Sequence, residues 1–135
     1  MARAGASGRA ISARELADLY RAHGQDFLRR VRGPFSLALY DRRERRLVLA
    51  LDRIGQRPLF LCRRGDRVAF ASRLCALRRL PGFQPRLDRQ AIFDYLYFHV
   101  VPAPGTIYAD CSKLLPAQMA VFDASGERQD SFYWT

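Results

Sequence analysis

Apolar and polar positions alternate in blocks along the middle of the chain, in a pattern that predicts β-strands. Four apolar runs, FSLALY, LVLAL, PLFLC and RVAFA, lie between residues 35 and 71. The first two runs are apolar at successive positions, whereas a strand with one wet face alternates apolar and polar residues, so we expect both their faces to be covered. The last two runs flank Arg63–Asp66, where Gly65 suits a left-handed turn position. They therefore predict an antiparallel hairpin.

Helical patterns stand on either side of these strands. The sequence SARE, residues 12–15, predicts a capping box in which the Ser12 hydroxyl and the Glu15 carboxylate each bind a free backbone amide. The helix that follows is expected to end at Gly24. A short helix is predicted over SRLCALRRL, and Asp88 is expected to cap another helix over RQAIFDYLYFH.

The two ends of the chain differ in character. Residues 1–11 are small, polar and glycine-containing, which predicts a flexible N-terminal tail, and residues 12–135 are expected to form one domain. Near the C-terminus, QMAVFDASGERQDSFYW predicts a hairpin around Ser125 and Gly126. Helices combined with antiparallel strands predict an α+β fold.

Composition narrows the class of protein. The chain has 135 residues, of which 49% are apolar, enough to form a hydrophobic core. No run approaches the roughly 18 uninterrupted apolar residues of a membrane span. The opening MARAGASGRAISA lacks the apolar centre of a secretory signal. We therefore expect a cytoplasmic protein that does not interact with a membrane.

The formal charge of +10 raises the question of nucleic-acid binding, because basic surfaces attract phosphate. The basic residues are scattered along the whole chain, and their one cluster lies between two apolar runs, where a solvated hairpin turn is expected. No aromatic residue interrupts that cluster, and we expect no specific nucleic-acid partner. The cluster consists of Arg42, Arg43, Arg45 and Arg46.

Cysteine and histidine are the remaining carriers of chemistry. Cys62, Cys75 and Cys111 are odd in number and far apart, so we expect buried thiols rather than a disulfide framework or a zinc site. His23 and His99 have no evident nucleophile partner, and both are expected to be structural. Neither paired carboxylates nor a glycine-rich phosphate loop occurs. The residues alone predict no catalytic site, metal or cofactor.

Three consecutive blocks of the sequence resemble a known family in order and spacing. They are GPFSLALYDRRERRLVLALDRIGQRPLF, FASRLCALRRLPGF and YLYFHVVPAPGTIYADCSKLLPAQMAVF. They resemble the later two-thirds of the N-terminal class II glutamine amidotransferase domain of glutamine-hydrolysing asparagine synthetase, from about Ser12 to Trp134. The resemblance implies a truncated type 2 amidotransferase-like domain over residues 12–135. Its fold would be a partial N-terminal-nucleophile-type sandwich, with two antiparallel sheets face to face between helical layers.

The same resemblance exposes departures from the family at the glutamine site. Enzymes of this class attack the glutamine amide with an N-terminal cysteine, whereas this chain begins Met-Ala-Arg. Cys62 is expected in a strand, Cys75 in a helix and Cys111 in a late loop, and the family's arginine and Asn-Gly glutamine-site motifs have no counterpart here. A family aspartate that binds the glutamine amino group aligns with Ser12. Helix capping explains Ser12, and a residual ligand role is the alternative.

Two further substitutions suit a degenerate active site. The family's Ala-Arg-Asp reads Ala50, Leu51 and Asp52 here, and its Ser-Glu reads Ser72 and Arg73. The first change removes a rigid hydrogen-bonding fork, and the second reverses a charge.

The resemblance supports two functions from different classes. One is a noncatalytic domain that acts as scaffold or subunit for a separately encoded ATP-dependent amide-forming synthetase, or that forms a homo-oligomer. The other is part of a split glutaminase that supplies ammonia for asparagine synthesis, with its nucleophile on another chain. A gene fragment with no present function is a third alternative.

The resemblance implies that a contact with a partner uses HVVPAPGTIY and SFYWT, the segments that in the family lie toward the synthetase half. Prolines limit the ordering entropy lost on docking, and large aromatics are residues that anchor interfaces. The alternative is that these aromatics close the core of their own domain. The residues concerned are Pro102, Pro104, Phe132, Tyr133 and Trp134.

Overall fold

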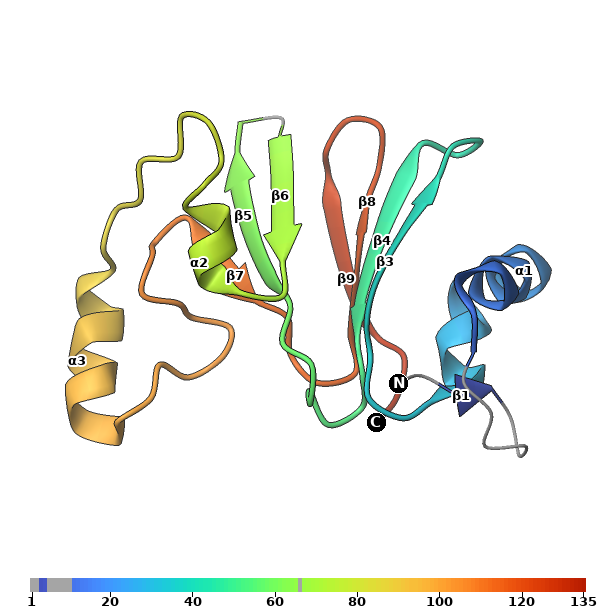
Figure 1. Ribbon diagram of the computed structural model, residues 1–135, viewed down its shortest axis with the longest axis horizontal. Helices are drawn as coiled ribbons and strands as arrows, with labels where there is room; N and C mark the ends of the chain where they lie inside the picture. Colours follow the sequence, from blue (N-terminus) through green and yellow to red (C-terminus); the bar gives the residue numbers. More distant parts are fainter. Residues whose placement is uncertain (1–2, 5–10, 66) are drawn as a thin grey trace. The chain divides into compact units, whose positions relative to one another are not determined.

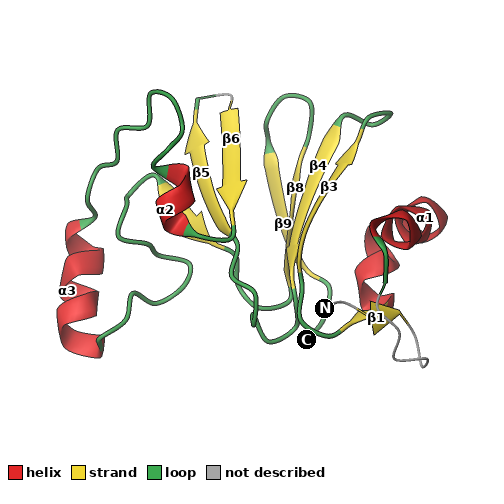
Figure 2. Cartoon of the chain, in the orientation of Figure 1, coloured by secondary structure: helices red, strands yellow, loops and turns green. Residues whose placement is uncertain are grey.

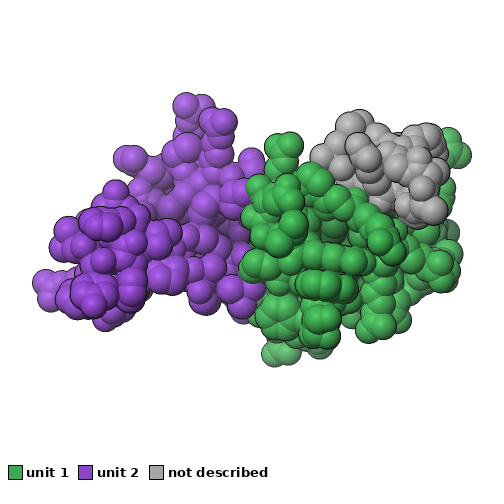
Figure 3. Space-filling model, turned by 90° about the horizontal axis from the view of Figure 1, so that it is seen from below, with its two compact units in different colours: residues 1–57, 116–135 green, residues 58–115 purple. Residues whose placement is uncertain are grey.

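The computed structural model describes residues 3–4, 11–65 and 67–135, and the chain forms two compact units. Unit 1 consists of Met1–Arg57 and Pro116–Thr135, and unit 2 consists of Pro58–Leu115 (Figure 3). Each unit contains its own antiparallel sheet and its own buried apolar cluster.

Unit 1 is built on a four-stranded antiparallel sheet with the strand order β3-β4-β8-β9 (Figure 1). Its strands are β3 (Ser36–Asp41), β4 (Arg46–Leu51), β8 (Gln118–Phe122) and β9 (Arg128–Phe132). The hairpins predicted at the arginine cluster and around Gly126 are both present. Pairing of Val48 with Val121 joins the two hairpins across the centre of the sheet.

Burial in this sheet differs from strand to strand. In β4, Val48, Leu49 and Ala50 are fully buried, and every residue of β8 is buried. In β3, half-buried and exposed residues alternate, and Tyr40 is 60% exposed. The expectation that both faces are covered is therefore right for β4 and wrong for β3. The reason is that β3 is one of the two edge strands of this sheet, a position that an apolar run cannot reveal.

The helices of unit 1 follow the predicted local signals. Helix α1 (Ala13–His23) begins with a complete capping box, in which the Ser12 hydroxyl accepts the Glu15 amide and the Glu15 carboxylate accepts the Ser12 amide. It ends at Gly24, whose φ of 55° lies in the left-handed region. A 3₁₀-helix, η2 (Gly24–Arg30), continues from there and buries Phe27 and Leu28 completely.

The core of unit 1 lies between these helices and the sheet. Residues of η2, of β4 and β8, and of the segments between η2 and β3, just before β8 and just after β9 contribute to it. It comprises Phe27, Leu28, Val31, Phe35, Val48, Ala50, Ala117, Met119, Val121 and Tyr133. Leu16, Leu19 and Tyr20 of α1 pack against its edge.

Much of the predicted flexible tail at residues 1–11 falls outside the described residues, and its flexibility stays a prediction. Within it, β1 (Arg3–Ala4) pairs antiparallel with β2 (Val31–Arg32).

Unit 2 holds a three-stranded antiparallel sheet of order β6-β5-β7. Strands β5 (Phe60–Arg64) and β6 (Arg67–Ala71) form the predicted hairpin, and Gly65 has a φ of 58°. Strand β7 (Cys111–Lys113) was not predicted, so the assignment of Cys111 to a loop is wrong. Three residues with the sequence CSK carry no strand pattern, and only pairing with β5 defines the strand.

Two helices accompany the sheet of unit 2 (Figure 2). Helix α2 (Leu74–Leu77) is shorter than the predicted run. Helix α3 (Arg89–Phe98) begins at Asp88, whose carboxylate accepts the amides of Gln90 and Ala91, as predicted. Of its residues only Ala91 is buried, and most of its large apolar side chains are exposed.

Helices and antiparallel sheets together confirm the α+β class, and this content is consistent with part of an N-terminal-nucleophile-type sandwich. Among the described residues, no helix combines the length and the apolar character that crossing a membrane requires.

Candidate functional site

A buried aspartate organises the loop that follows β4. Asp52 is 1% exposed, and its carboxylate accepts four backbone amides. Its Oδ1 atom accepts the amides of Ile54 and Gln56 at 3.1 and 3.2 Å, and its Oδ2 atom accepts those of Phe35 and Arg57, both at 3.3 Å. A carboxylate that satisfies four amides holds their backbone in one conformation, so the loop over residues 52–57 is rigidly defined.

The main chain of Asp52 extends this arrangement to the segment before β8. The Asp52 carbonyl oxygen accepts the amides of Gly55 and Ala117 at 3.1 and 2.9 Å. Gly55 has a φ of 70°, and a Cβ atom there would lie 3.1 Å from Cγ of Pro116. Both the backbone conformation and the close approach therefore favour glycine at this turn.

Tyr133 fixes the C-terminal segment to the same place. Its hydroxyl donates to the Leu51 carbonyl oxygen at 2.7 Å, and its ring stacks on Phe35 with a centroid distance of 6.5 Å. Burial, followed by the negative charge of Asp52, raises the pKa of Tyr133 to about 12. Tyr133 thus belongs to the core, and it places its neighbours Phe132 and Trp134 at the surface, where they are 53% and 50% exposed.

Arg53 connects the loop with the C-terminal segment. Its guanidinium lies over the Trp134 ring, 5.4 Å from the ring centroid, and its Nη2 atom donates to the Arg29 carbonyl oxygen at 3.2 Å. The Nε atom of Arg53 is buried and has no hydrogen-bond partner within the described part of the chain.

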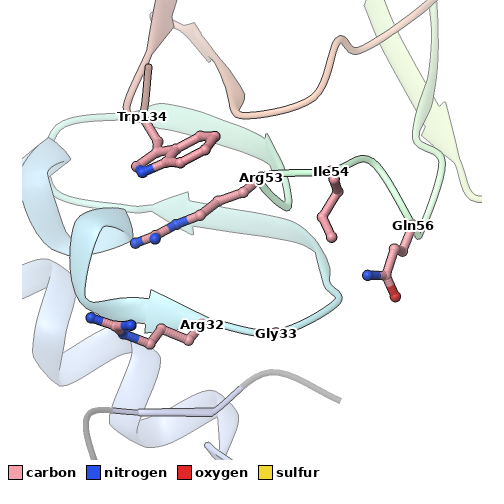
Figure 4. Close-up of a pocket in the computed structure, with 6 residues that line it drawn as sticks. All are labelled: Arg32, Gly33, Arg53, Ile54, Gln56 and Trp134. Atoms are coloured by element: carbon pink, nitrogen blue, oxygen red, sulfur yellow. The ribbon is translucent and has the colours of Figure 1, made fainter.

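A pocket of about 320 Å³ opens beside this pair (Figure 4). Figure 4 shows the Arg53 side chain running beneath the indole ring of Trp134, with Arg32 beyond it. The lining residues are Arg32, Gly33, Arg53, Ile54, Gln56 and Trp134. Three of them belong to the loop that Asp52 organises, so the walls of the pocket are held by the core.

The other predicted interface segment lies in unit 2. Pro102 and Pro104 are exposed. Lys113 ties the loop to β7, because its Nζ donates to the Val101 carbonyl oxygen at 2.6 Å and its backbone amide to the Pro104 carbonyl oxygen at 2.8 Å. Burial lowers the pKa of Lys113. The predicted interface residues therefore divide between the two units, three in unit 1 and two in unit 2.

Ser12 is fully engaged as a helix cap. Its hydroxyl accepts the Glu15 amide at 3.2 Å and also lies 2.8 Å from the Glu15 carboxylate. At the position where the family resemblance places a glutamine-binding aspartate, Ser12 therefore offers neither a negative charge nor a free hydroxyl.

The cysteines occupy positions that were only partly foreseen. Cys62 and Cys111 are buried and lie directly opposite each other on β5 and β7, whereas Cys75 is exposed. Burial, followed by the neighbouring Cys62 thiol, raises the pKa of Cys111 to about 12. The expectation of buried thiols is wrong for Cys75, because α2 is a short helix that buries Leu77 instead.

Both histidines lie at the C-terminal ends of helices. His23 is the last residue of α1. His99 adopts a φ of 58° after α3 and donates its amide to the Tyr95 carbonyl oxygen at 2.8 Å. In the ranges that the structure describes, no group of three or more His, Cys, Asp or Glu side chains could hold a metal ion.

Sequence reasoning missed the Asp52 loop and the arginine pocket. The signal was present in DRIGQRP, where an aspartate after a buried strand precedes a glycine at a spacing typical of side-chain-stabilised turns. The contribution of Trp134 and Arg32 to the same pocket is a tertiary contact that no local pattern encodes.

Comparison with known proteins now defines the class of this protein. A family model described as a glutamine amidotransferase domain matches residues 9–134. The chain therefore belongs to the glutamine amidotransferase domain family.

Its relatives indicate the branch of that family. A Mycobacterium tuberculosis protein, whose name relates it to glutamine-hydrolysing asparagine synthetase, is 35% identical over 98 residues, covering 70% of this chain and 15% of the relative. The Bacillus subtilis asparagine synthetase (glutamine-hydrolysing) 3 is 27% identical over 103 residues, covering 76% of this chain and 17% of the relative. This domain is therefore related to asparagine synthetases, and it spans about one-sixth of the length of these curated relatives.

Proposed function

We propose that this chain is an amidotransferase-like domain without glutaminase activity of its own, and that it serves as a subunit or scaffold for an ATP-dependent amide-forming synthetase. The observation that carries the proposal is the position of the three thiols. Cys62 lies within β5, Cys75 within α2 and Cys111 at the start of β7. In class II amidotransferases the nucleophilic cysteine also supplies a free α-amine. Each of these cysteines has its nitrogen in a peptide bond and cannot do so.

The environment of the thiols supports the same conclusion. The thiolate is the nucleophile, and a pKa of about 12 leaves Cys111 protonated at neutral pH. Its partner Cys62 is 2% exposed, so a glutamine amide cannot reach it. Cys75 is exposed, but it stands on a four-residue helix in a cluster that packs Leu74 and Leu77 against the sheet.

The expected outcome is that the purified chain releases no ammonia from glutamine above the buffer background. A coupled assay for free ammonia measures this, with and without prior treatment by iodoacetamide. Glutamine-dependent release that iodoacetamide abolishes would overturn the proposal. Release that appears only when a second chain with an N-terminal cysteine is added would favour a split glutaminase instead.

The proposed contact with a synthetase uses the exposed aromatics beside Tyr133. Phe132 and Trp134 are half exposed on a segment that Tyr133 anchors, so they are presented to a partner with little loss of ordering entropy. The exposed Pro102 and Pro104 of unit 2 are proposed as a second contact, independent of the first.

A matched pair of variants tests this contact. Trp134→Ala should weaken binding to a co-expressed synthetase by about tenfold or more and change the melting temperature little. Tyr133→Phe removes the buried hydrogen bond to Leu51 and should lower the melting temperature by several degrees, about 1 kcal/mol, without a specific loss of affinity. If Trp134→Ala lowers the melting temperature as much as Tyr133→Phe, and affinity follows only the folded fraction, the interface assignment fails.

A further inference from the structure

The pocket beside Trp134 carries positive charge that the described residues do not neutralise. Arg32 and Arg53 both line it, and neither forms an ion pair with any residue of the described ranges. By contrast, Arg29 nearby is paired with Asp26 at 3.3 Å. Two guanidinium groups at one cavity in a chain of net charge +10 favour an anionic ligand.

The guanidinium of Arg53 is held in a fixed position at the pocket. Its Nε atom is buried and has no hydrogen-bond partner among the described residues, so a ligand meets the other nitrogen atoms of the group. The Nη2 atom of the same guanidinium already donates to Arg29, and its face lies against Trp134, so the group is held in place. A fixed guanidinium matches a planar acceptor such as a carboxylate.

The remaining walls of the pocket restrict the class of anion. Trp134 and the 73% exposed Ile54 provide apolar surface, and Gln56 provides an amide. A phosphate would have to desolvate several charged oxygens against these apolar walls, whereas a carboxylate has only two oxygens to satisfy. The cavity volume of about 320 Å³ lies in the range of small-molecule sites.

We propose that this pocket binds a small organic carboxylate. The carboxylate lies between the guanidinium groups of Arg32 and Arg53, and the apolar part of the ligand contacts Ile54 and Trp134. Because Asp52 fixes the loop that carries Arg53, Ile54 and Gln56, the site is formed before the ligand arrives. The proposal concerns a small ligand in unit 1, and it holds whether or not the chain binds a synthetase.

Trp134 makes the proposal directly measurable, because it is the only tryptophan of the chain. The full chain is titrated with sodium benzoate at constant ionic strength while the tryptophan emission is recorded. We expect a saturable change in emission with a dissociation constant of millimolar order or tighter. Benzamide, which has nearly the same shape without the charge, should leave the emission unchanged, and inorganic phosphate should bind at least about tenfold more weakly.

Three variants locate the site. Arg32→Gln and Arg53→Gln should each weaken benzoate binding by about tenfold, the loss expected for one charge-assisted contact. Arg43→Gln, on the exposed turn between β3 and β4, is the matched control and should bind benzoate like the parent chain. Arg53→Gln also removes the hydrogen bond to Arg29 and could impair folding. Arg32 is exposed, so Arg32→Gln tests the site without that complication.

Several results would overturn the proposal. Equal titration by benzoate and benzamide would show an apolar pocket without charge recognition. Equal titration by benzoate and phosphate would show nonspecific attraction of anions. A linear, unsaturated decrease in emission, or unchanged binding by Arg32→Gln, would show that benzoate does not occupy this pocket.

Discussion

Asp52 in unit 1 and Asp88 in unit 2 perform the same chemistry in different surroundings. Asp52 follows strand β4, and Asp88 follows an irregular segment. Each carboxylate accepts backbone amides. Asp52 is fully buried and accepts four amides, one of them from Phe35, which is 17 residues away in the sequence. Asp88 is partly exposed and accepts only the amides of Gln90 and Ala91, at the start of α3.

The difference separates a tertiary element from a local one. Removing Asp52 would deprive amides of two separate segments of their acceptor, and the hydrogen bond of the Phe35 amide is buried, so the loop, the core and the pocket depend on Asp52 together. Removing Asp88 would affect only two amides in the first turn of α3, where water can replace the lost acceptor. The surroundings of the two residues also differ, since Asp52 is fully buried whereas the large apolar side chains of α3 are exposed.

The largest effect is expected for Asp52→Ala. Four amides lose their acceptor, one in a buried and three in partly buried hydrogen bonds, so the free energy of unfolding should fall by about 3 kcal/mol or more, and the melting temperature by more than about 10 °C. Emission of Trp134 reports the unfolding of unit 1, because this residue lies beside the loop.

The control for Asp52→Ala lies in the same unit. Asp123 accepts the amides of Ser125 and Glu127 in the exposed hairpin turn between β8 and β9. Asp123→Ala should lower the melting temperature far less, since water can satisfy those amides. Equal effects from the two variants would show that burial of the Asp52 carboxylate is not what makes it important.

These expectations also show what the sequence could predict. The capping box at Ser12, the cap at Asp88 and the hairpin at Gly65 were all correct, because each depends on residues within a few positions of one another. Strand β7 was missed because its identity depends on pairing with β5, and the exposure of β3 was missed because edge position is a property of the whole sheet.

The candidate site was predictable to a smaller extent for the same reason. The sequence singled out Trp134 as a large aromatic near the C-terminus, but it gave no indication that Arg32 and Arg53 lie beside it, because these residues come from three separate segments. Tyr133 was grouped with its neighbours, although its hydrogen bond to Leu51 assigns it to the core.

A smaller effect is expected for Asp88→Ala. Loss of an N-terminal helix cap costs about 1 kcal/mol, so hydrogen exchange in peptides from Arg89–Phe98 should accelerate about fivefold. Gln90→Ala is the matched control, because it removes only the side-chain contact to Asp94 at 2.8 Å and should change exchange much less. If both variants exchange alike, the Asp88 cap does not stabilise α3.

The smallest effect on stability is expected on the exposed surface of α3. Leu96 is 71% exposed and Tyr97 is 71% exposed, so Leu96→Gln should change the free energy of unfolding by less than about 0.5 kcal/mol. Leu77→Ala, at a buried position of the same unit, should cost about 2 kcal/mol or more.

Self-association should respond to the exposed position instead. Leu96→Gln should reduce it, because a contiguous exposed apolar surface favours contacts between molecules. Sedimentation at low micromolar concentration and binding of a hydrophobic dye measure this, and Leu96→Gln should reduce both. A parent chain that sediments as a monomer and binds no dye would show that the exposed aromatics of α3 do not drive association.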